Sequence, residues 1–516
     1  MKHSADLYAL SRLAFGPDEV SADEIARLSL RGWLNLQLHP DDAKDAVFAE
    51  RVENLKFRIK YNESKDWSAV DEMRSLRWLE APIEKLSELA DPDKPIANQE
   101  KSRPRIEVIA ATLVRAVYSR WQTREVLCDF WHNHFSVNAW DNHVGIALPV
   151  YDREIIRRHA LGNFREMLEA VSKSTAMLWY LNNRSSRTGA PNENYARELF
   201  ELHTLGRDAY LNGIYNRWRD VPGALNGKPV GYIDQDVYEA ARAFTGWGLE
   251  DGSGLGGGLK LPRTGRFIYV ESWHDNYQKR ILATEFDPYQ PALADGLKVL
   301  DLAAFHPATA RFLSKKLCVR LLSDNPPESL ITSSAKVWTN NKTKPDQIAR
   351  VVSHIALSKE FAQIRKAKVK RPLELVASYV RASGFNFSPT EGLISEIDAS
   401  GQRLFGWPTP TGHPDAVDYW IGMNTMRRRW SLIAGLSENW WGTGVFDALA
   451  PLSSKEITAE RFISYWLEQL FGDQQPQCSP ALLHAAGLLP GSVINNPKQA
   501  CRLVGLLAMT PEFQQC

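Results

Sequence analysis

Cysteine is scarce in this chain of 516 residues, and neither sign of charge is in excess. The five cysteines, at positions 128, 318, 478, 501 and 516, are far apart and form no C-x-x-C pair, which excludes a disulfide scaffold and a structural zinc site. Because 62 basic residues oppose 61 acidic ones, the net charge of +1 gives no reason to expect nucleic acid or an anionic membrane as a partner.

Long apolar segments are also missing. The first residues, Met1 to Asp6, lack the apolar core of a secretion signal. No later run reaches the roughly 20 apolar residues that span a bilayer as a helix. We therefore expect no membrane span and, for the sequence as it stands, a cytoplasmic location.

Patterns typical of strands are scarce, and most apolar residues recur at the spacing of a helix. We predict an all-α fold that is mainly helical with a few short strands. The predicted helices include a charged amphipathic helix within 44–90 and one long helix over 106–130. Segments rich in Gly, Pro and polar residues predict a mobile loop over 91–104, an inserted surface loop over 207–233 and a Gly-rich loop over 250–266.

The segment that ends at Gly206 is predicted to be a helix with Gly206 as its left-handed cap. At about 100° per residue, Asn194, Arg197, Glu198 and Glu201 share one face of this helix. Such a polar stripe is either a solvated face or the polar wall of a pocket.

A second polar stripe, Asp236, Glu239 and Arg242, has the same acid–acid–arginine spacing on the helix predicted over 234–247. Acidic and arginine side chains on two helices can pair with each other and fix their packing, which is the structural alternative to a functional site. The His274–Asp275 pair on a predicted loop is a weak signal by itself.

The histidines His132 and His134 stand two positions apart between aromatic residues. On an extended segment both side chains point the same way, whereas on a helix they diverge by about 160°. They form a shared metal site only if the backbone is extended or turns here. Otherwise they are core histidines bonded to backbone groups.

Several blocks of the sequence, distributed over nearly its whole length, resemble the signature blocks of the bacterial domain of unknown function 1800 family. The most specific block is NENYARELFELHTLG at 192–206. The others, in chain order, lie at 10–17, 130–135, 241–247, 274–275, 306–310, 410–415 and 510–514.

The resemblance implies one large, predominantly helical domain over residues 1–516. Members of the family are usually exported, and they are often encoded beside a partner protein with a sulfatase- or phosphatase-like fold. This chain departs from the family in lacking an export signal and in carrying an insertion of about 20 residues, from Leu211 to Val230. An added loop beside a site can set substrate choice or bind a partner.

The imidazoles and carboxylates of these blocks are the donors from which helical bundles build metal centres. We predict a divalent transition metal, iron, manganese or zinc, held by His132, His134, Glu201, Asp236, Glu239 and His274. The predicted catalytic set, in which an acid serves as general base and arginines orient the substrate, is Glu198, Arg197, Arg242 and Asn194.

These residues predict a metal-dependent enzyme with oxygenase or oxidase chemistry on a peptide or glycan substrate. A metal-dependent hydrolase is open as well, because the same ligands serve both reactions. The other class is a non-catalytic helical partner or scaffold protein for a neighbouring enzyme. Cys128 has no matched partner, so a thiolate nucleophile is not expected, and His203 is expected to be structural.

Overall fold

The computed structural model describes residues 4–363, 368–452, 457–472, 483–484, 486–489 and 491–516. Helices dominate these residues and strands occur as short antiparallel pairs, so the prediction of a mainly helical, single-domain fold is confirmed. One continuous apolar core runs from Tyr8 in the first helix to Phe513 in the last. Cys478 lies outside the described residues, and the other four cysteines are buried and unpaired.

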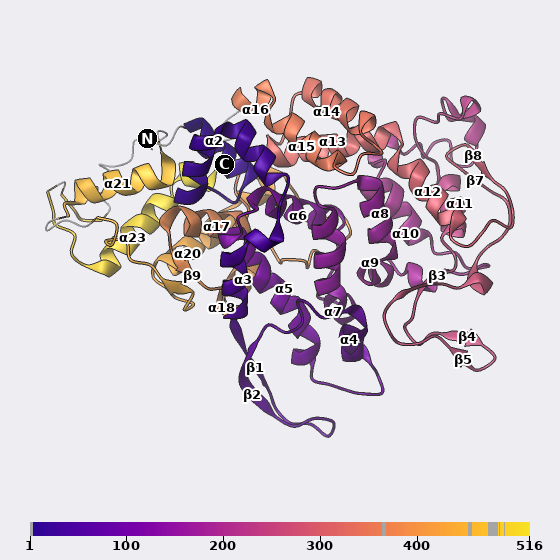
Figure 1. Ribbon diagram of the computed structural model, residues 1–516, viewed down its shortest axis with the longest axis horizontal. Coiled ribbons are helices and arrows are strands. Elements are labelled where there is room, and N and C mark those ends of the chain that lie inside the picture. Colours follow the sequence, from indigo (N-terminus) through magenta and orange to yellow (C-terminus); the bar gives the residue numbers. More distant parts are fainter. Residues whose placement is uncertain (1–3, 364–367, 453–456, 473–482, 485, 490) are drawn as a thin grey trace.

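The first third of the chain supplies helices at the centre of the molecule (Figure 1). They are α1 (Ser4–Leu13), α2 (Glu19–Gln37), α3 (Ala46–Glu53), α4 (Ile83–Ser87), α5 (Asn98–Tyr118), α6 (Gln122–His134), α7 (Asn142–Val150), the π-helix η3 (Tyr151–Arg157), α8 (Phe164–Lys173) and α9 (Thr175–Tyr180). α5 packs against both α6 and α7, so the α6 helix lies deep in the core.

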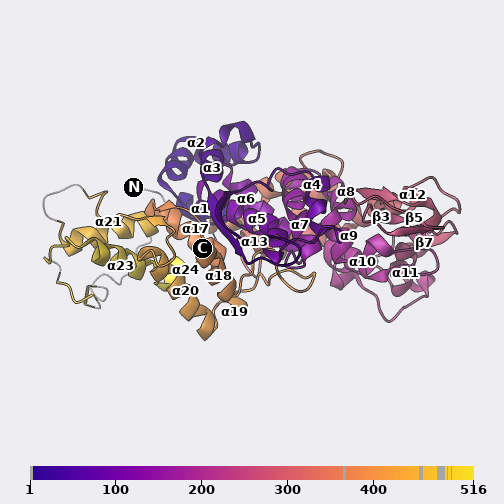
Figure 2. The same cartoon turned by 90° about the horizontal axis from the view of Figure 1, so that it is seen from below.

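The middle of the chain extends the molecule at one end, where α11, α12 and the strands β7 and β8 lie together (Figures 1 and 2). Its helices are α10 (Glu193–Glu198), the π-helix η5 (Leu199–His203), α11 (Asp234–Ala243), α12 (Ala294–Ala304), α13 (Pro307–Leu321), α14 (Glu328–Asn340), α15 (Gln347–Ala356) and α16 (Lys359–Gln363). α13 begins with His306 as its N-cap and Pro307 in its first turn, as a helix start favours.

The last part of the chain returns to the centre with α17 and forms the opposite end of the molecule with α21 and α23 (Figures 1 and 2). Its helices are α17 (Pro372–Ser383), α18 (Glu391–Ala399), α19 (Val417–Trp420), α20 (Met423–Ser437), α21 (Ala459–Phe471), α23 (Pro497–Ala508) and α24 (Pro511–Gln514). No helix in the described part of the chain is long and apolar enough to cross a membrane.

The strands form five antiparallel pairs among the described residues. They are β1 (Lys56–Tyr61) with β2 (Val70–Ser75), β3 (Trp247–Leu249) with β6 (Phe267–Tyr269), β4 (Gly254–Gly256) with β5 (Leu259–Lys260), β7 (Lys279–Ile281) with β8 (Thr284–Phe286), and β9 (Asn386–Phe387) with β10 (Gly444–Val445).

The hairpin of β1 and β2 shows that the helix predicted within 44–90 is wrong for its middle part. Phe57 and Ile59 are buried and alternate with exposed neighbours, which is the period of a half-buried strand. Phe57 packs with Val114 of α5. The burial of this alternating face outweighs the helical propensity of the charged residues between them.

The single helix predicted over 106–130 is also wrong, because α5 ends at Tyr118 and α6 begins at Gln122. The Gln122 side-chain amide donates to the Ser119 carbonyl oxygen at 2.8 Å, and the Ser119 hydroxyl donates to Asp45 at 2.6 Å. These hydrogen bonds satisfy polar groups at the break, and apolar spacing alone does not reveal them.

The three predicted loops hold more structure than their composition indicates. α5 begins at Asn98, inside the segment predicted as a loop over 91–104. In the segment 207–233, a parallel bridge between Tyr210 and Tyr232 joins the beginning of the segment to its end. The segment also has a small apolar core of its own. The Gly-rich segment 250–266 contains the short β4–β5 pair.

Gly206 follows η5 and allows a close approach of two elements. Its φ of 87° and ψ of 161° differ from the left-handed cap that the sequence predicts, and this region of backbone conformation is open almost only to glycine. A Cβ atom at Gly206 would meet the Phe312 ring of α13 at 2.7 Å. The glycine therefore lets α13 pack directly against the end of η5.

We expect Gly206→Ala to lower the free energy of unfolding by about 2 kcal/mol, because it adds backbone strain and overpacks Phe312. Urea unfolding measures the change. Gly213→Ala is the matched control, since Gly213 has no heavy atom within 4 Å of an added Cβ, and its effect should stay within about 0.5 kcal/mol. Equal effects of the two substitutions would contradict this account.

Candidate functional site

Four buried or nearly buried charged side chains link three helices in the core. Asp129 of α6 pairs with Arg320 of α13 and with Arg371, the residue before α17. Glu374 of α17 also pairs with both arginines, at 2.6 Å to Arg320 and 3.4 Å to Arg371. We call these four residues the ion-pair cluster.

Pairing keeps the cluster charged in spite of its burial. Burial alone would raise the pKa of the Glu374 carboxyl, but Arg320 and Arg371 hold that pKa well below its usual range. Burial would lower the pKa of Arg371, and Asp129 with Glu374 raises it instead. Since a buried charge without its partner is costly, the cluster fixes the positions of α6, α13 and α17 relative to one another.

A pocket of about 280 Å³ adjoins the cluster, and we call it the basic pocket. α6, α13 and the loop 407–415 form it. Its lining residues are Phe130, Asn133, His134, Lys316, Arg320, Arg371, Trp407, Thr411, Gly412, His413, Pro414 and Asp415. Three buried polar atoms of these residues have no hydrogen-bond partner among the described residues, namely Arg320 Nε, Arg371 Nε and His413 Nδ1.

The Asn133 side chain of α6 holds the loop 407–415 in place. The Asn133 amide donates to the His413 carbonyl at 2.9 Å and accepts from the His413 N–H at 2.6 Å. A Cβ at Gly412 would lie 2.1 Å from the Asn133 carbonyl oxygen, and the φ of Gly412 is 73°. Only glycine therefore permits this close approach, which places His413 and Asp415 at the pocket.

Lys316 is the cation that faces the basic pocket without an acidic partner. In the described part of the chain no carboxylate lies within ion-pair distance of its amine, whereas Arg320 and Arg371 are both paired. Its Nζ lies 2.9 Å from His134 Nδ1, and His134 Nε2 lies 3.2 Å from the His203 carbonyl. Nε2–H therefore donates to that carbonyl, and Nδ1 accepts a hydrogen bond from Lys316.

Burial sets the protonation of this pair. It lowers the pKa of Lys316 to about 8, although the Asp415 carboxylate acts in the opposite direction. Burial, reinforced by Lys316 and His203, lowers the pKa of His134 well below the ordinary histidine value. His134 is thus a neutral acceptor, and both forms of the Lys316 amine are accessible near neutral pH.

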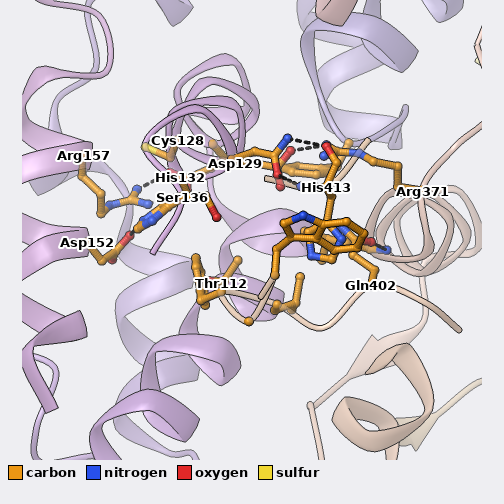
Figure 3. A pocket seen from close by; sticks show the side chains of 18 residues that line it. Thr112, Cys128, Asp129, His132, Ser136, Asp152, Arg157, Arg371, Gln402 and His413 are labelled. Carbon is orange, nitrogen blue, oxygen red and sulfur yellow. Dashed lines mark hydrogen bonds and ion pairs between the residues drawn. The ribbon is translucent and has the colours of Figure 1, made fainter. Parts of the chain in front are cut away.

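A smaller pocket of about 50 Å³, here the inner pocket, shares Asn133, Arg371, Trp407 and His413 with the basic pocket. Figure 3 shows His132 and Asp152 on one side of it and His413 and Arg371 on the other. Cys128 also lines this pocket, and burial raises the pKa of its thiol to about 12, which favours the protonated form.

The two predicted histidine ligands lie in the last turn of α6 and diverge, as helical backbone requires. His132 Nε2 lies 2.9 Å from Asp152 Oδ1, and Asp152 also pairs with Arg115 at 3.0 Å. His134 instead faces Lys316 and the basic pocket. The condition for a shared metal site, an extended or turning backbone, is not met.

The predicted residues of the 192–206 block lie on α10 and η5. Asn194 is exposed, and Arg197 lies 3.6 Å from Asp234 and 3.7 Å from Glu193. Glu201 pairs with Arg207 at 2.5 Å. Glu198 is half-buried, and burial, then the neighbouring Glu201, raises the pKa of its carboxyl.

The predicted residues of α11 and the following loop belong to a paired network. Asp236 accepts from the backbone N–H groups of Ile233 and Leu282, at 3.0 and 2.7 Å. Arg242 binds Glu239 at 2.6 Å and Asp275 at 2.9 Å. These contacts match the structural alternative, in which acids and arginines fix the packing.

His274 is occupied in the same region. Its Nδ1 lies 2.7 Å from the Thr245 carbonyl and its Nε2 lies 3.3 Å from Asp295. Lys279 also binds Asp295, at 2.7 Å. Both ring nitrogens of His274 therefore have protein partners.

The predicted metal ligands do not fit one metal centre. Among the described residues, no group of three or more His, Cys, Asp or Glu side chains is placed to hold a metal ion. His132, His274 and Asp236 instead form hydrogen bonds with different partners, namely Asp152, Asp295 and the Leu282 N–H, in that order. Binding of iron, manganese or zinc stays a prediction that this donor arrangement does not support.

Sequence patterns missed most of the basic pocket. Lys316 and Arg320 stand four residues apart on α13, so they share one face of the helix, and a basic pair at that spacing is a usable signal. Asp129, directly before the aromatic block that contains His132, is another. The loop 410–415 was identified as a signature block, but its contact with α6 has no signal in local spacing.

A family model described as "Protein of unknown function (DUF1800)" matches residues 8–515 of the chain. No curated protein and no solved structure matches it. The match covers every residue of the ion-pair cluster and of the basic pocket, as well as all of the residues predicted from the sequence.

The lowered pKa of Lys316 predicts a pH-dependent effect of Lys316→Met on stability. Between pH 8 and the ordinary lysine value of 10.5, the unfolded chain holds a proton that the folded chain has released. The wild-type protein therefore gains stability with rising pH in this window, and the variant lacks this gain. Urea unfolding measures the free energy of unfolding of each protein at about pH 7 and about pH 9.5. The value for Lys316→Met minus the value for wild type should be more positive at the lower pH. If this difference in the free energy of unfolding, variant minus wild type, does not change with pH or becomes more positive as pH rises, Lys316 is not desolvated.

Proposed function

The chain belongs to the family described as Protein of unknown function (DUF1800), and we propose that it is an enzyme that binds a small anionic substrate in the basic pocket and transfers a proton through Lys316. The observation that carries the proposal is the Lys316 amine. It faces a pocket, has a lowered pKa and lacks an acidic partner among the described residues.

Charge favours an anion in this pocket. Lys316, Arg320 and Arg371 line it, and among the described residues Asp415 is the one acid in its lining. The Asp415 carboxylate already pairs with Lys368 at 3.1 Å, and Lys368 and the two arginines lower its pKa against the effect of burial. A carboxylate or phosphate group would pair with the Lys316 amine and with arginine N–H groups that the ion-pair cluster holds in place.

The protonation of the Lys316 amine suits acid–base catalysis. A group whose pKa lies near the working pH can both accept and release a proton. When the amine is neutral, its lone pair takes a proton from the bound substrate and forms a new N–H bond. The electron pair of the broken bond stays on the substrate, where the arginine charges stabilise it, and the ammonium group then returns its proton.

His134 acts as a positioning residue for this amine. As a neutral acceptor it fixes the direction of one Lys316 N–H bond, and the His203 carbonyl fixes the imidazole in turn. The neutral ring adds no positive charge beside the amine, so it does not lower the lysine pKa further.

The functions predicted from the sequence receive less support. Oxygenase, oxidase or metal-dependent hydrolase chemistry needs a grouped ligand set, which the predicted residues do not form in the described structure. A volume of about 280 Å³ admits a small acid or the charged end of a larger substrate, rather than a length of peptide or glycan chain. A scaffold role for a neighbouring protein gives no reason for a partly buried amine at a pocket.

Isothermal titration with succinate and with inorganic phosphate tests the anion site. We expect binding of at least one of them, and we expect Lys316→Met to weaken it about tenfold or more, because a charge-assisted hydrogen bond is worth about 1.5–3 kcal/mol. The matched control is Lys336→Met, which removes an exposed lysine of α14 and should leave the affinity unchanged. Equal affinities of wild type and Lys316→Met would refute the site.

The proton-transfer step has its own readout. Small carboxylic and 2-oxo acids are incubated with the protein in D₂O, and loss of carbon-bound proton signals is followed by NMR. We expect exchange of at least one acid by wild type and by Lys336→Met, but not by Lys316→Met. If the protein binds anions but exchanges no carbon-bound proton, it is a binding protein, and the enzymatic part of the proposal is wrong.

A further inference from the structure

A larger pocket lies near the Lys316–His134 pair and has Phe312 among its lining residues. It has a volume of about 750 Å³, within the range of pockets that hold small ligands. Phe312 lines it, and the same ring lies 6.3 Å from the His134 ring and 5.6 Å from Lys316 Nζ. We call it the apolar pocket because its walls are mostly hydrocarbon, as Leu282, Leu302 and Phe305 show.

We propose that the apolar pocket binds a long-chain carboxylic acid, with the hydrocarbon chain along its apolar wall and the carboxylate at its basic mouth. The inference concerns a separate site and does not depend on proton transfer by Lys316.

The end of the segment 211–230, which the sequence predicts to be an insertion, forms one wall of this pocket. Pro229 and Val230, from the end of that segment, face the start of α13. His306 joins the two parts, since its Nε2–H donates to the Pro229 carbonyl at 3.0 Å and its Nδ1 accepts from the Ala308 N–H at 3.1 Å. The wall is therefore tied to a helix start by defined hydrogen bonds.

The exposed apolar surface points to a hydrocarbon ligand. Val230 lines the pocket and is 55% exposed, although it follows a segment with a buried core of its own. A hydrocarbon chain in the pocket would remove this surface, together with that of Leu302 and Phe305, from water, and such burial is the main source of affinity for apolar ligands.

The charges at the mouth favour a carboxylate as the polar end. Lys228 and Lys315 line the pocket, and in the described part of the chain neither has a carboxylate within ion-pair distance. The acid Asp301 is already paired with Arg165 at 2.6 Å. Asp208 is the other acid at the mouth, and its charge helps to raise the pKa of Arg311, which also pairs with Glu328.

Fluorescence titration of the full-length protein with cis-parinaric acid tests the proposal. We expect saturable binding at one site per chain. Val230→Asp places a carboxylate on the apolar wall and should weaken binding about tenfold or more. Leu225→Asp is the matched control, because Leu225 lies in the same segment, is 71% exposed and does not line the pocket. Both positions are exposed, so neither substitution disturbs the core.

The polar end is tested by competition. Displacement of the probe by stearic acid and by stearyl alcohol is compared between wild type and Lys315→Gln. We expect Lys315→Gln to lower the affinity for stearic acid several-fold and to leave the affinity for stearyl alcohol unchanged. Absence of saturable binding, or equal effects of Val230→Asp and Leu225→Asp, would overturn the site, and equal effects on acid and alcohol would overturn the carboxylate assignment.

Discussion

The paired charges of Asp129, Glu374, Arg320 and Arg371 are the constraint on which the site depends. They join α6, α13 and α17, and the Arg371–Asp129 pair spans 242 positions of the chain. Each arginine has both acids as partners, so the charges can be buried without being neutralised. Because the cluster fixes the three helices, it also determines where the remaining side chains of α13 point.

Lys316 obtains its properties from this arrangement. It lies one turn before Arg320 on α13, so the two side chains share a face of the helix. The acids of the cluster are already engaged by Arg320 and Arg371, and Asp415 by Lys368. The lysine is therefore left with a neutral acceptor, and burial then lowers its pKa to about 8. The same helix carries Phe312, which lines the apolar pocket and whose ring lies 5.6 Å from Lys316 Nζ.

The sequence permitted a sound prediction of the mainly helical fold, because apolar spacing is a local property. It also gave the right condition for His132 and His134, which diverge because both lie on α6. The helix predicted across β1 is wrong because the alternation of Phe57 and Ile59 is short and stands among charged residues that are also common in helices. Convergence of residues from separate blocks could not be predicted from spacing. His274 and Asp236 have the right chemistry for a metal site, but each is bound by its own neighbours.

The most direct test of the account is a crystal structure of the protein soaked in selenate, with the anion located by the anomalous scattering of selenium. The account predicts a selenate ion in the basic pocket, with oxygen atoms within hydrogen-bond distance of Lys316 Nζ and of an Arg371 or Arg320 N–H group. The same soak of Lys316→Met should leave that position without anomalous density. Selenate bound at other surfaces while the basic pocket of the wild-type protein holds none would contradict the account.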